Sequence, residues 1–161
     1  DQLARLVHGA GTAFGLGLPA VLVAAIVGTL LGAVAGLRGG VADVLVLRLV
    51  ELFLCFPTLL FLLFAAAFFG SSWLALSVVL AAMFWTSFAR IVRGELLSLR
   101  ERDFVLVARG LGVRPLRIVT HHLLPQILGQ IGVTAAFCIA AAIVAESTLS
   151  FLGLGPASIS W

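Results

Sequence analysis

Long apolar stretches without formal charge constrain this chain more than any other feature. Leu6–Leu37 and Leu52–Ala89 contain no Asp, Glu, Lys or Arg, and a third apolar stretch covers Ile127–Ala145. As a helix, about 20 apolar residues cross the roughly 30 Å of bilayer hydrocarbon. The second stretch is too long for one crossing, and Gly70–Ser72 divides it. The sequence therefore predicts an all-α, polytopic transmembrane bundle with spans near residues 12–37, 52–69, 73–89 and 127–145.

Composition agrees with a membrane protein and excludes several other classes. Only 11% of the residues are charged, against about 25% in soluble domains, and the mean hydropathy is +1.23. The aromatic residues lie in apolar runs and not on a basic surface, which argues against nucleic-acid binding. Cys55 and Cys138 are far apart and form neither a zinc nor a redox motif. Because the chain begins at Asp1 without a signal peptide, we expect residues 1–161 to be one transmembrane domain within a longer protein.

The arginines predict an orientation in the membrane. Two of them follow the first span and seven follow the third, whereas Arg5 alone falls on the opposite side. Positive residues are retained on the cytoplasmic side, so the first span runs inward and a basic segment at about 90–126 lies inside. Trp73 and Trp161 then lie at the outer interface. The nine inner arginines are Arg38, Arg48, Arg90, Arg93, Arg100, Arg102, Arg109, Arg114 and Arg117.

Two patterns concern how the spans pack. Glycines at four-residue spacing run from Gly28 to Gly36, which permits close helix contact; ordinary packing is favoured over a dedicated dimer face. Asp43, Leu47 and Glu51 stand at helical spacing among apolar neighbours. This second pattern predicts an interfacial amphipathic segment that leads into the second span.

The basic segment contains signals for two short helices. Asp103 can cap the first helix, Gly110 and Gly112 can end it, and Pro115 fits the first turn of a second helix that stops before Pro125. The first helix also has an apolar surface rimmed by charge, which is typical of a docking site for a soluble partner. The apolar side chains of this surface are Val105, Leu106 and Leu111.

The stretch VARGLGVRPLRIVTHHLLP resembles the cytoplasmic coupling loop of permease subunits in binding-protein-dependent ABC importers. That signature contains E-A-A, a glycine after three further residues, and a terminal L-P. Ala108 matches the second alanine, Gly112 the glycine and Leu124–Pro125 the closing pair, whereas Leu106 replaces the glutamate and Val107 the first alanine. By this resemblance, the residues that couple to an ATPase are Val105, Leu106, Val107, Ala108, Arg109, Gly110, Leu111, Gly112, Leu124 and Pro125.

Three further stretches, FLCFPTLLFLL, ARIVRGELLSLRERDFV and AESTLSFLGLG, are similar to the C-type permease subunit of dipeptide, oligopeptide and nickel importers, in the same order. The resemblance implies the fold of a type I ABC importer permease, of which this chain lacks the first and last spans. It also implies a second homologous permease, two cytoplasmic ABC ATPases and an extracytoplasmic substrate-binding protein in a bacterial or archaeal cytoplasmic membrane. The implied activity is ATP-driven import of di- or oligopeptides by alternating access, with nickel as the alternative substrate.

Other residues offer little for catalysis or metal binding. The sequence has no H-E-x-x-H, G-x-S-x-G or P-loop motif, so we expect no enzyme activity and no cofactor in this chain, with ATP bound by partner subunits. The His121–His122 pair is expected to be solvated. Glu146, at the outer end of the fourth span, is an ionisable residue near membrane depth; a structural hydrogen bond is favoured over a role in the pathway.

Two alternatives belong to other classes of membrane protein. A channel or secondary-carrier fragment would use the basic loop only to set topology, and it would usually carry charged residues deep in its spans. The predicted spans contain none apart from Glu146, which argues against this class. A structural membrane subunit, which merely assembles with others, would show no dependence on an ATPase.

Overall fold

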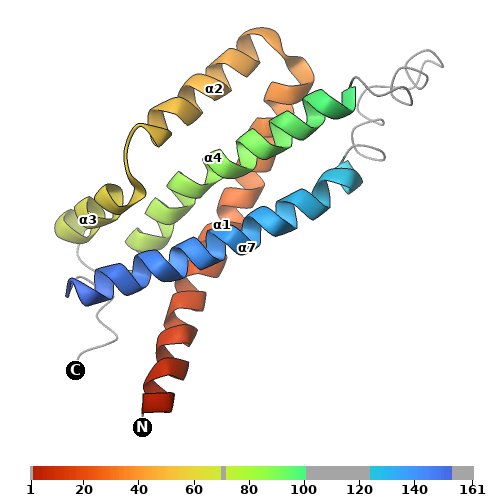
Figure 1. The fold of residues 1–161 in the computed structure, drawn as a ribbon. Coiled ribbons are helices and arrows are strands. Elements are labelled where there is room, and N and C mark those ends of the chain that lie inside the picture. Colours follow the sequence, from red (N-terminus) through yellow and green to blue (C-terminus); the bar gives the residue numbers. More distant parts are fainter. Residues whose placement is uncertain (1, 70–71, 101–123, 154–161) are drawn as a thin grey trace.

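The computed structural model describes residues 2–69, 72–100 and 124–153, and within these ranges it contains helices and no strand (Figure 1). The predicted all-α class is therefore confirmed. The helices are α1 (Gln2–Arg38), α2 (Gly40–Leu54), α3 (Thr58–Phe69), α4 (Trp73–Arg100) and α7 (Leu124–Phe151).

Three of these helices contain segments that are long and apolar enough to cross a membrane. The segments are Phe14–Arg38 in α1, Trp73–Leu99 in α4 and Pro125–Phe151 in α7. A fourth crossing exists if α2 and α3, which meet at a sharp bend, are counted together as one broken span. The described part of the chain thus has three to four membrane-spanning units, in agreement with the predicted polytopic bundle.

The closest helix contact joins α1 to α4 through the glycines of α1. A Cβ atom on Gly28 would lie 2.4 Å from the carbonyl oxygen of Trp85 and 2.6 Å from Cβ of Phe88. On Gly32 it would lie 2.5 Å from the carbonyl oxygen of Ala89. Contacts below 3.0 Å do not occur for real Cβ atoms, so these positions accept no side chain. The glycine spacing therefore serves packing within this chain, as the ordinary-packing interpretation predicts.

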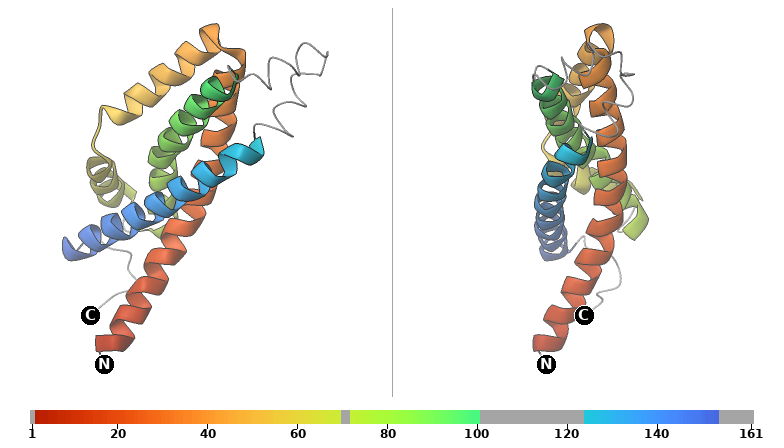
Figure 2. Two further views of the ribbon diagram at one scale, coloured as in Figure 1. Left: turned by 45° about the vertical axis from the view of Figure 1, so that its right-hand side comes forward. Right: turned by 90° about the vertical axis from the view of Figure 1, so that its right-hand side faces the viewer.

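α7 completes the bundle by crossing α1 and contacting α4 (Figure 2). A core of buried apolar side chains lies between α1, α4 and α7, with two contributions from α2 and one from α3. Elsewhere the surface is strongly apolar: Ile26 is 62% and Phe137 74% exposed, which suits a chain surrounded by lipid and membrane subunits. Core members include Leu16, Ala20, Ala24, Leu62, Leu76, Leu80, Phe88, Ala142 and Leu149.

α2 turns back from the end of α1 and runs along α4. Gly39 and Gly40 have φ of 64° and 58°, a left-handed conformation that glycine adopts without steric cost. Near its start, α2 is tied to α4 by an ion pair between Asp43 and Arg93. Near its end, the ring of Phe53 packs edge-on against the ring of Trp85, with 5.5 Å between the ring centroids. α2 therefore contacts α4 near both of its ends, and the interfacial position expected for this segment stays a prediction.

The predicted second span at 52–69 is interrupted after its first residues. α2 ends at Leu54, α3 begins at Thr58, and the two helices are bent by 70°. Pro57 explains the break, because proline has no N–H for the helix ladder and its ring disfavours a helical conformation at Phe56. The apolar run therefore forms the end of one helix and the whole of another, where the hydropathy pattern predicts a single helix.

α4 is longer than predicted, because it continues through residues 90–100, which the sequence analysis assigns to the loop. No proline interrupts Trp73–Arg100, and the final turns are held by packing. Leu96 and Ile127 are fully buried in a second apolar cluster, where the ends of α1 and α4 meet the start of α7. We call this the loop end of the bundle, since residues 101–123 connect α4 to α7 there.

Candidate functional site

The predicted ATPase-coupling helix, Val105–Gly112, lies outside the described residues. The helices on either side of it are described: α4 ends at Arg100 and α7 begins at Leu124, both at the loop end (Figure 1). Pro125 stands in the first turn of α7, where a missing N–H costs no hydrogen bond. The closing L-P pair of the loop signature thus starts the last described helix, and the coupling role of the loop stays a prediction.

Asp43 and Arg93 form the strongest polar link between helices in the described part of the chain. Nε of Arg93 donates to one carboxylate oxygen of Asp43, and its Nη2 donates to the other at 2.7 Å. Such two-pronged pairing fixes geometry as well as adding energy. Both side chains are about four-fifths buried. In the sequence, Asp43 is predicted to belong to an interfacial helix and Arg93 is one of the arginines that predict topology, and only their contact reveals the link.

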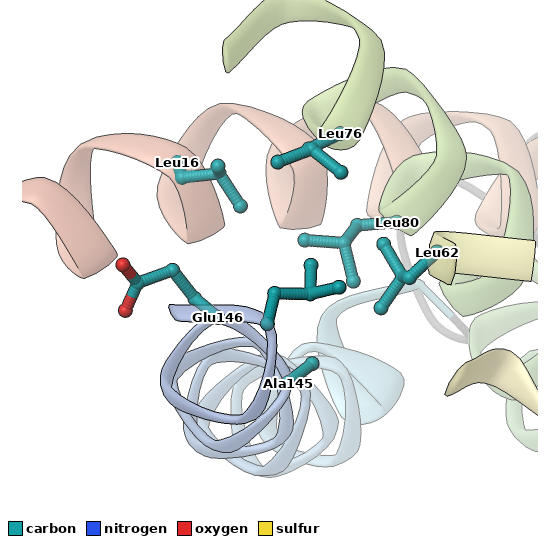
Figure 3. A pocket seen from close by; sticks show the side chains of 7 residues that line it. Leu16, Leu62, Leu76, Leu80, Ala145 and Glu146 are labelled. Atoms are coloured by element: carbon teal, nitrogen blue, oxygen red, sulfur yellow. The ribbon is translucent and has the colours of Figure 1, made fainter. Parts of the chain in front are cut away.

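Glu146 is buried where α1, α3, α4 and α7 converge. Its residue is 6% exposed, and its carboxylate accepts a hydrogen bond of 3.2 Å from Oγ of Ser150 one turn later in α7. In Figure 3 its carboxylate points away from the labelled leucines. After α7, Gly153 takes a φ of 74° and donates to the carbonyl of Ser150, a left-handed helix end. This arrangement favours the structural interpretation of Glu146, which stays a prediction.

The pocket beside Glu146 is apolar and small. The described residues that line it include no second polar side chain, and its empty volume of about 170 Å³, open solvent included, is below the roughly 300–1,000 Å³ of typical ligand pockets. In this conformation it cannot hold a peptide. Its lining residues are Leu16, Leu62, Leu76, Leu80, Ala145, Glu146 and Leu149.

A second ion pair lies on the outer face of α2. Nη1 of Arg48 donates to Oε2 of Glu51 at 2.8 Å, and both side chains are largely exposed. From the sequence, Arg48 is expected in a flanking segment, whereas α2, which carries it, runs beside α4. Arg48 and Glu51 are thus two further ionisable residues, besides Glu146, on a helix that packs against α4. The signal was present in the sequence, as a charged pair three residues apart in a helix whose other residues, apart from Asp43, are apolar.

The helices define the class: this is a polytopic α-helical membrane protein whose spans pack through glycine contacts and are joined by a basic segment. The model of the family described as binding-protein-dependent transport system inner membrane component matches residues 28–160. The chain belongs to this family of transport permease subunits, as the resemblance in the coupling loop implied.

Curated relatives carry peptide-transport names. The oligopeptide transport system permease protein OppC of Haemophilus influenzae is 35% identical over 96% of this chain and 50% of its own length. The dipeptide transport system permease protein DppC of Bacillus subtilis is 36% identical over 96% of this chain and 48% of its own length. A putative peptide permease protein of Brucella ovis is 36% identical over the whole chain and 54% of its own length. The chain thus spans about half the length of these relatives.

Proposed function

We propose that the chain is part of a membrane-spanning permease subunit of an ATP-driven importer for di- and oligopeptides. The observation that carries this proposal is the family match over residues 28–160. The peptide substrate is supported by relatives named as oligopeptide and dipeptide permeases. The complete transporter would contain a second homologous permease, two cytoplasmic ABC ATPases and an extracytoplasmic binding protein. It would work in the cytoplasmic membrane of a bacterium or archaeon.

The described helices suggest how movement of the loop reaches the spans. Residues 101–123 connect the ends of α4 and α7, so a force on this segment acts on both helices. The glycine contacts hold α4 against α1, and the Asp43–Arg93 pair holds it against α2. A tilt of α4 would therefore carry α1 and α2 with it. The bend between α2 and α3 is the point at which such a unit can move relative to α3.

The alternatives predict different behaviour. A nickel importer is not favoured, since the relatives named above are peptide permeases. A channel or secondary carrier would function without an ATPase. The family match speaks against this class, whereas scarce charge does not, because Arg48 and Glu51 lie on a helix that packs against α4.

Substitution of Gly112 tests the coupling role of the loop. Gly112 follows the predicted short helix where a left-handed residue is expected, and valine there should be strained by about 1 kcal/mol or more. In the full-length transporter in lipid vesicles, Gly112→Val should insert normally but weaken ATPase association, or leave ATP hydrolysis running without peptide uptake. Leu106→Glu, which restores the residue usual in the family, is the milder control. Normal coupling in Gly112→Val would remove the case for a transmission element.

A further inference from the structure

The outer face of α2 exposes an ion pair among exposed valines and leucines, where an apolar helix pair would not be expected to expose charge. Arg48 and Glu51 are 74% and 58% exposed in their side chains, whereas Val46 and Val50 on the other face are buried against the bundle. α2 then ends at the bend, where further backbone groups are freed. We call Arg48, Glu51 and the backbone of 52–55 the polar face of α2.

Two contacts establish the depth of this face. Asp43 pairs with Arg93 and, further along, Phe53 packs on Trp85, so α2 runs antiparallel to α4 over this stretch. Arg48 and Glu51 lie between Asp43 and Phe53 in sequence, and hence between these two contacts in depth. Trp85 stands close to the middle of the apolar segment Trp73–Leu99.

α1 gives the same depth independently. Gly28, close to the middle of its apolar segment Phe14–Arg38, packs on the backbone at Trp85. The end of α2 therefore lies near the middle of the spans, and the Arg48–Glu51 pair lies within about one to two helical turns of it, at 1.5 Å per residue.

The backbone at the bend adds acceptors to this face. The N–H of Cys55 donates to the carbonyl of Glu51 at 3.0 Å, but within the described residues no backbone donor meets the next carbonyls, those of Leu52, Phe53 and Leu54. Pro57 has no N–H to offer. Unpaired carbonyls in hydrocarbon cost several kcal/mol each, and non-helical backbone at membrane depth is found where it is buried in protein or lines a water-filled cavity.

Charge at this depth obeys the same restriction, because ionised side chains inside membranes face bundle interiors or water and mark substrate pathways. We propose that the polar face of α2 lines the water-filled path through which the substrate crosses, and that it contacts the charged ends of short peptides there. The Arg48 guanidinium binds the peptide carboxylate, and Glu51 together with the free carbonyls accepts hydrogen bonds from the ammonium and amide N–H groups. This inference rests on the proposed function of peptide import.

The chemistry of the face suits this ligand. A short peptide carries one cationic and one anionic end, and the face offers one partner for each, already paired at 2.8 Å. When no peptide is present the two charges neutralise each other, which lowers the cost of keeping them at this depth. Because both side chains are exposed, each can exchange its partner for a peptide terminus, and an exposed contact is weak enough to release the peptide onward.

Cys55 provides a native probe of the path. In the full-length transporter with every cysteine except Cys55 replaced by alanine, a charged membrane-impermeant maleimide should label Cys55, and the labelling should change when ATP and binding protein drive the cycle. Ile26→Cys, at similar depth on the exposed side of α1, is the control and should react only with the lipid-soluble N-ethylmaleimide. Labelling of Cys55 by the lipid-soluble reagent alone would place this face in lipid. Failure to react with either reagent would place it against another subunit, and either result overturns the proposal.

Charge removal tests the peptide contact. With trialanine as substrate, Arg48→Gln should raise the KM of uptake about tenfold, the worth of one charge-assisted hydrogen bond, and trialanine amide, which lacks the carboxylate, should show little further loss. Arg38→Gln, which removes an exposed arginine at the loop end, is the matched control and should leave KM unchanged. Reduced assembly of Arg48→Gln with normal KM would mean that the pair only stabilises the complex. Labelling of Cys55 in a transporter that takes up no peptide would overturn the peptide contact and peptide import, while leaving the path in place.

Discussion

Gly28→Ala is the sharpest test of the packing between α1 and α4. The new methyl group would meet the carbonyl oxygen of Trp85 at 2.4 Å and Cβ of Phe88 at 2.6 Å, whereas ordinary carbon contacts lie at about 3.5–4.0 Å. Because both atoms belong to the backbone or sit directly on it, no side-chain rotation can relieve the overlap. The two helices must move apart by about 1 Å.

The expected loss of stability follows from two opposing effects. Overpacking typically costs about 1–3 kcal/mol, and the rigid neighbours put Gly28→Ala at the upper end. Alanine favours a helix over glycine by about 1 kcal/mol, which offsets part of this. The net loss should be about 2 kcal/mol. Gly94→Ala is the matched control in α4, where nothing lies within 4 Å of the added Cβ; it should be neutral or gain up to about 1 kcal/mol.

The assay is SDS titration of the purified full-length permease in mixed micelles, followed by tryptophan fluorescence, because Trp85 lies in the contact. Peptide uptake in vesicles should fall with Gly28→Ala in proportion to the folded fraction. Equal unfolding free energies for Gly28→Ala and Gly94→Ala, within about 0.5 kcal/mol, would refute the close contact of α1 and α4 on which the described fold depends.

Three further substitutions address single features of the chain. Asp43→Asn should lower the free energy of unfolding by about 1–2 kcal/mol in the same titration, because the bond to Arg93 loses its charge assistance; an unchanged value would contradict the link between α2 and α4. Glu146→Gln should keep most uptake, whereas Glu146→Leu should lose about 1–3 kcal/mol of stability. Both variants assembling normally without transport would indicate a pathway role. Ser98→Cys in a cysteine-free protein should react with impermeant reagents from the cytoplasmic side only, and labelling from outside intact cells would reverse the orientation.

The long helices were predictable because their cause is local. The apolar segments of α1, α4 and α7 show in hydropathy, since each residue contributes to membrane partition largely by itself. Their ends were less predictable. α4 runs on to Arg100 because Leu96 is buried beside Ile127, and a residue 31 positions away leaves no trace in the local pattern. The break after α2 could have been foreseen at Pro57, but the hydropathy of the surrounding run outweighed it.

Some features of the candidate sites could be predicted from the sequence, whereas others depend on how the helices pack. The loop signature and the family could be recognised from residue order alone, because a docking motif is contiguous in the chain. The pairing of Asp43 with Arg93 and the depth of Arg48 could not be predicted from residue order, because each depends on how α2 lies against α4.

The sequence by itself determined that this chain is a helical membrane protein of the binding-protein-dependent permease family, since the preference of apolar residues for lipid and the spacing of a motif are properties of neighbouring residues. Only the tertiary structure decided which face of each helix is covered. The glycines of α1 allow α4 to approach, α2 folds back beside them, and Arg48 with Glu51 is thereby carried from an apparent flank to the depth of the spans. Charge has a different meaning at that depth, because the surroundings, and not the residue, determine the cost of keeping it there.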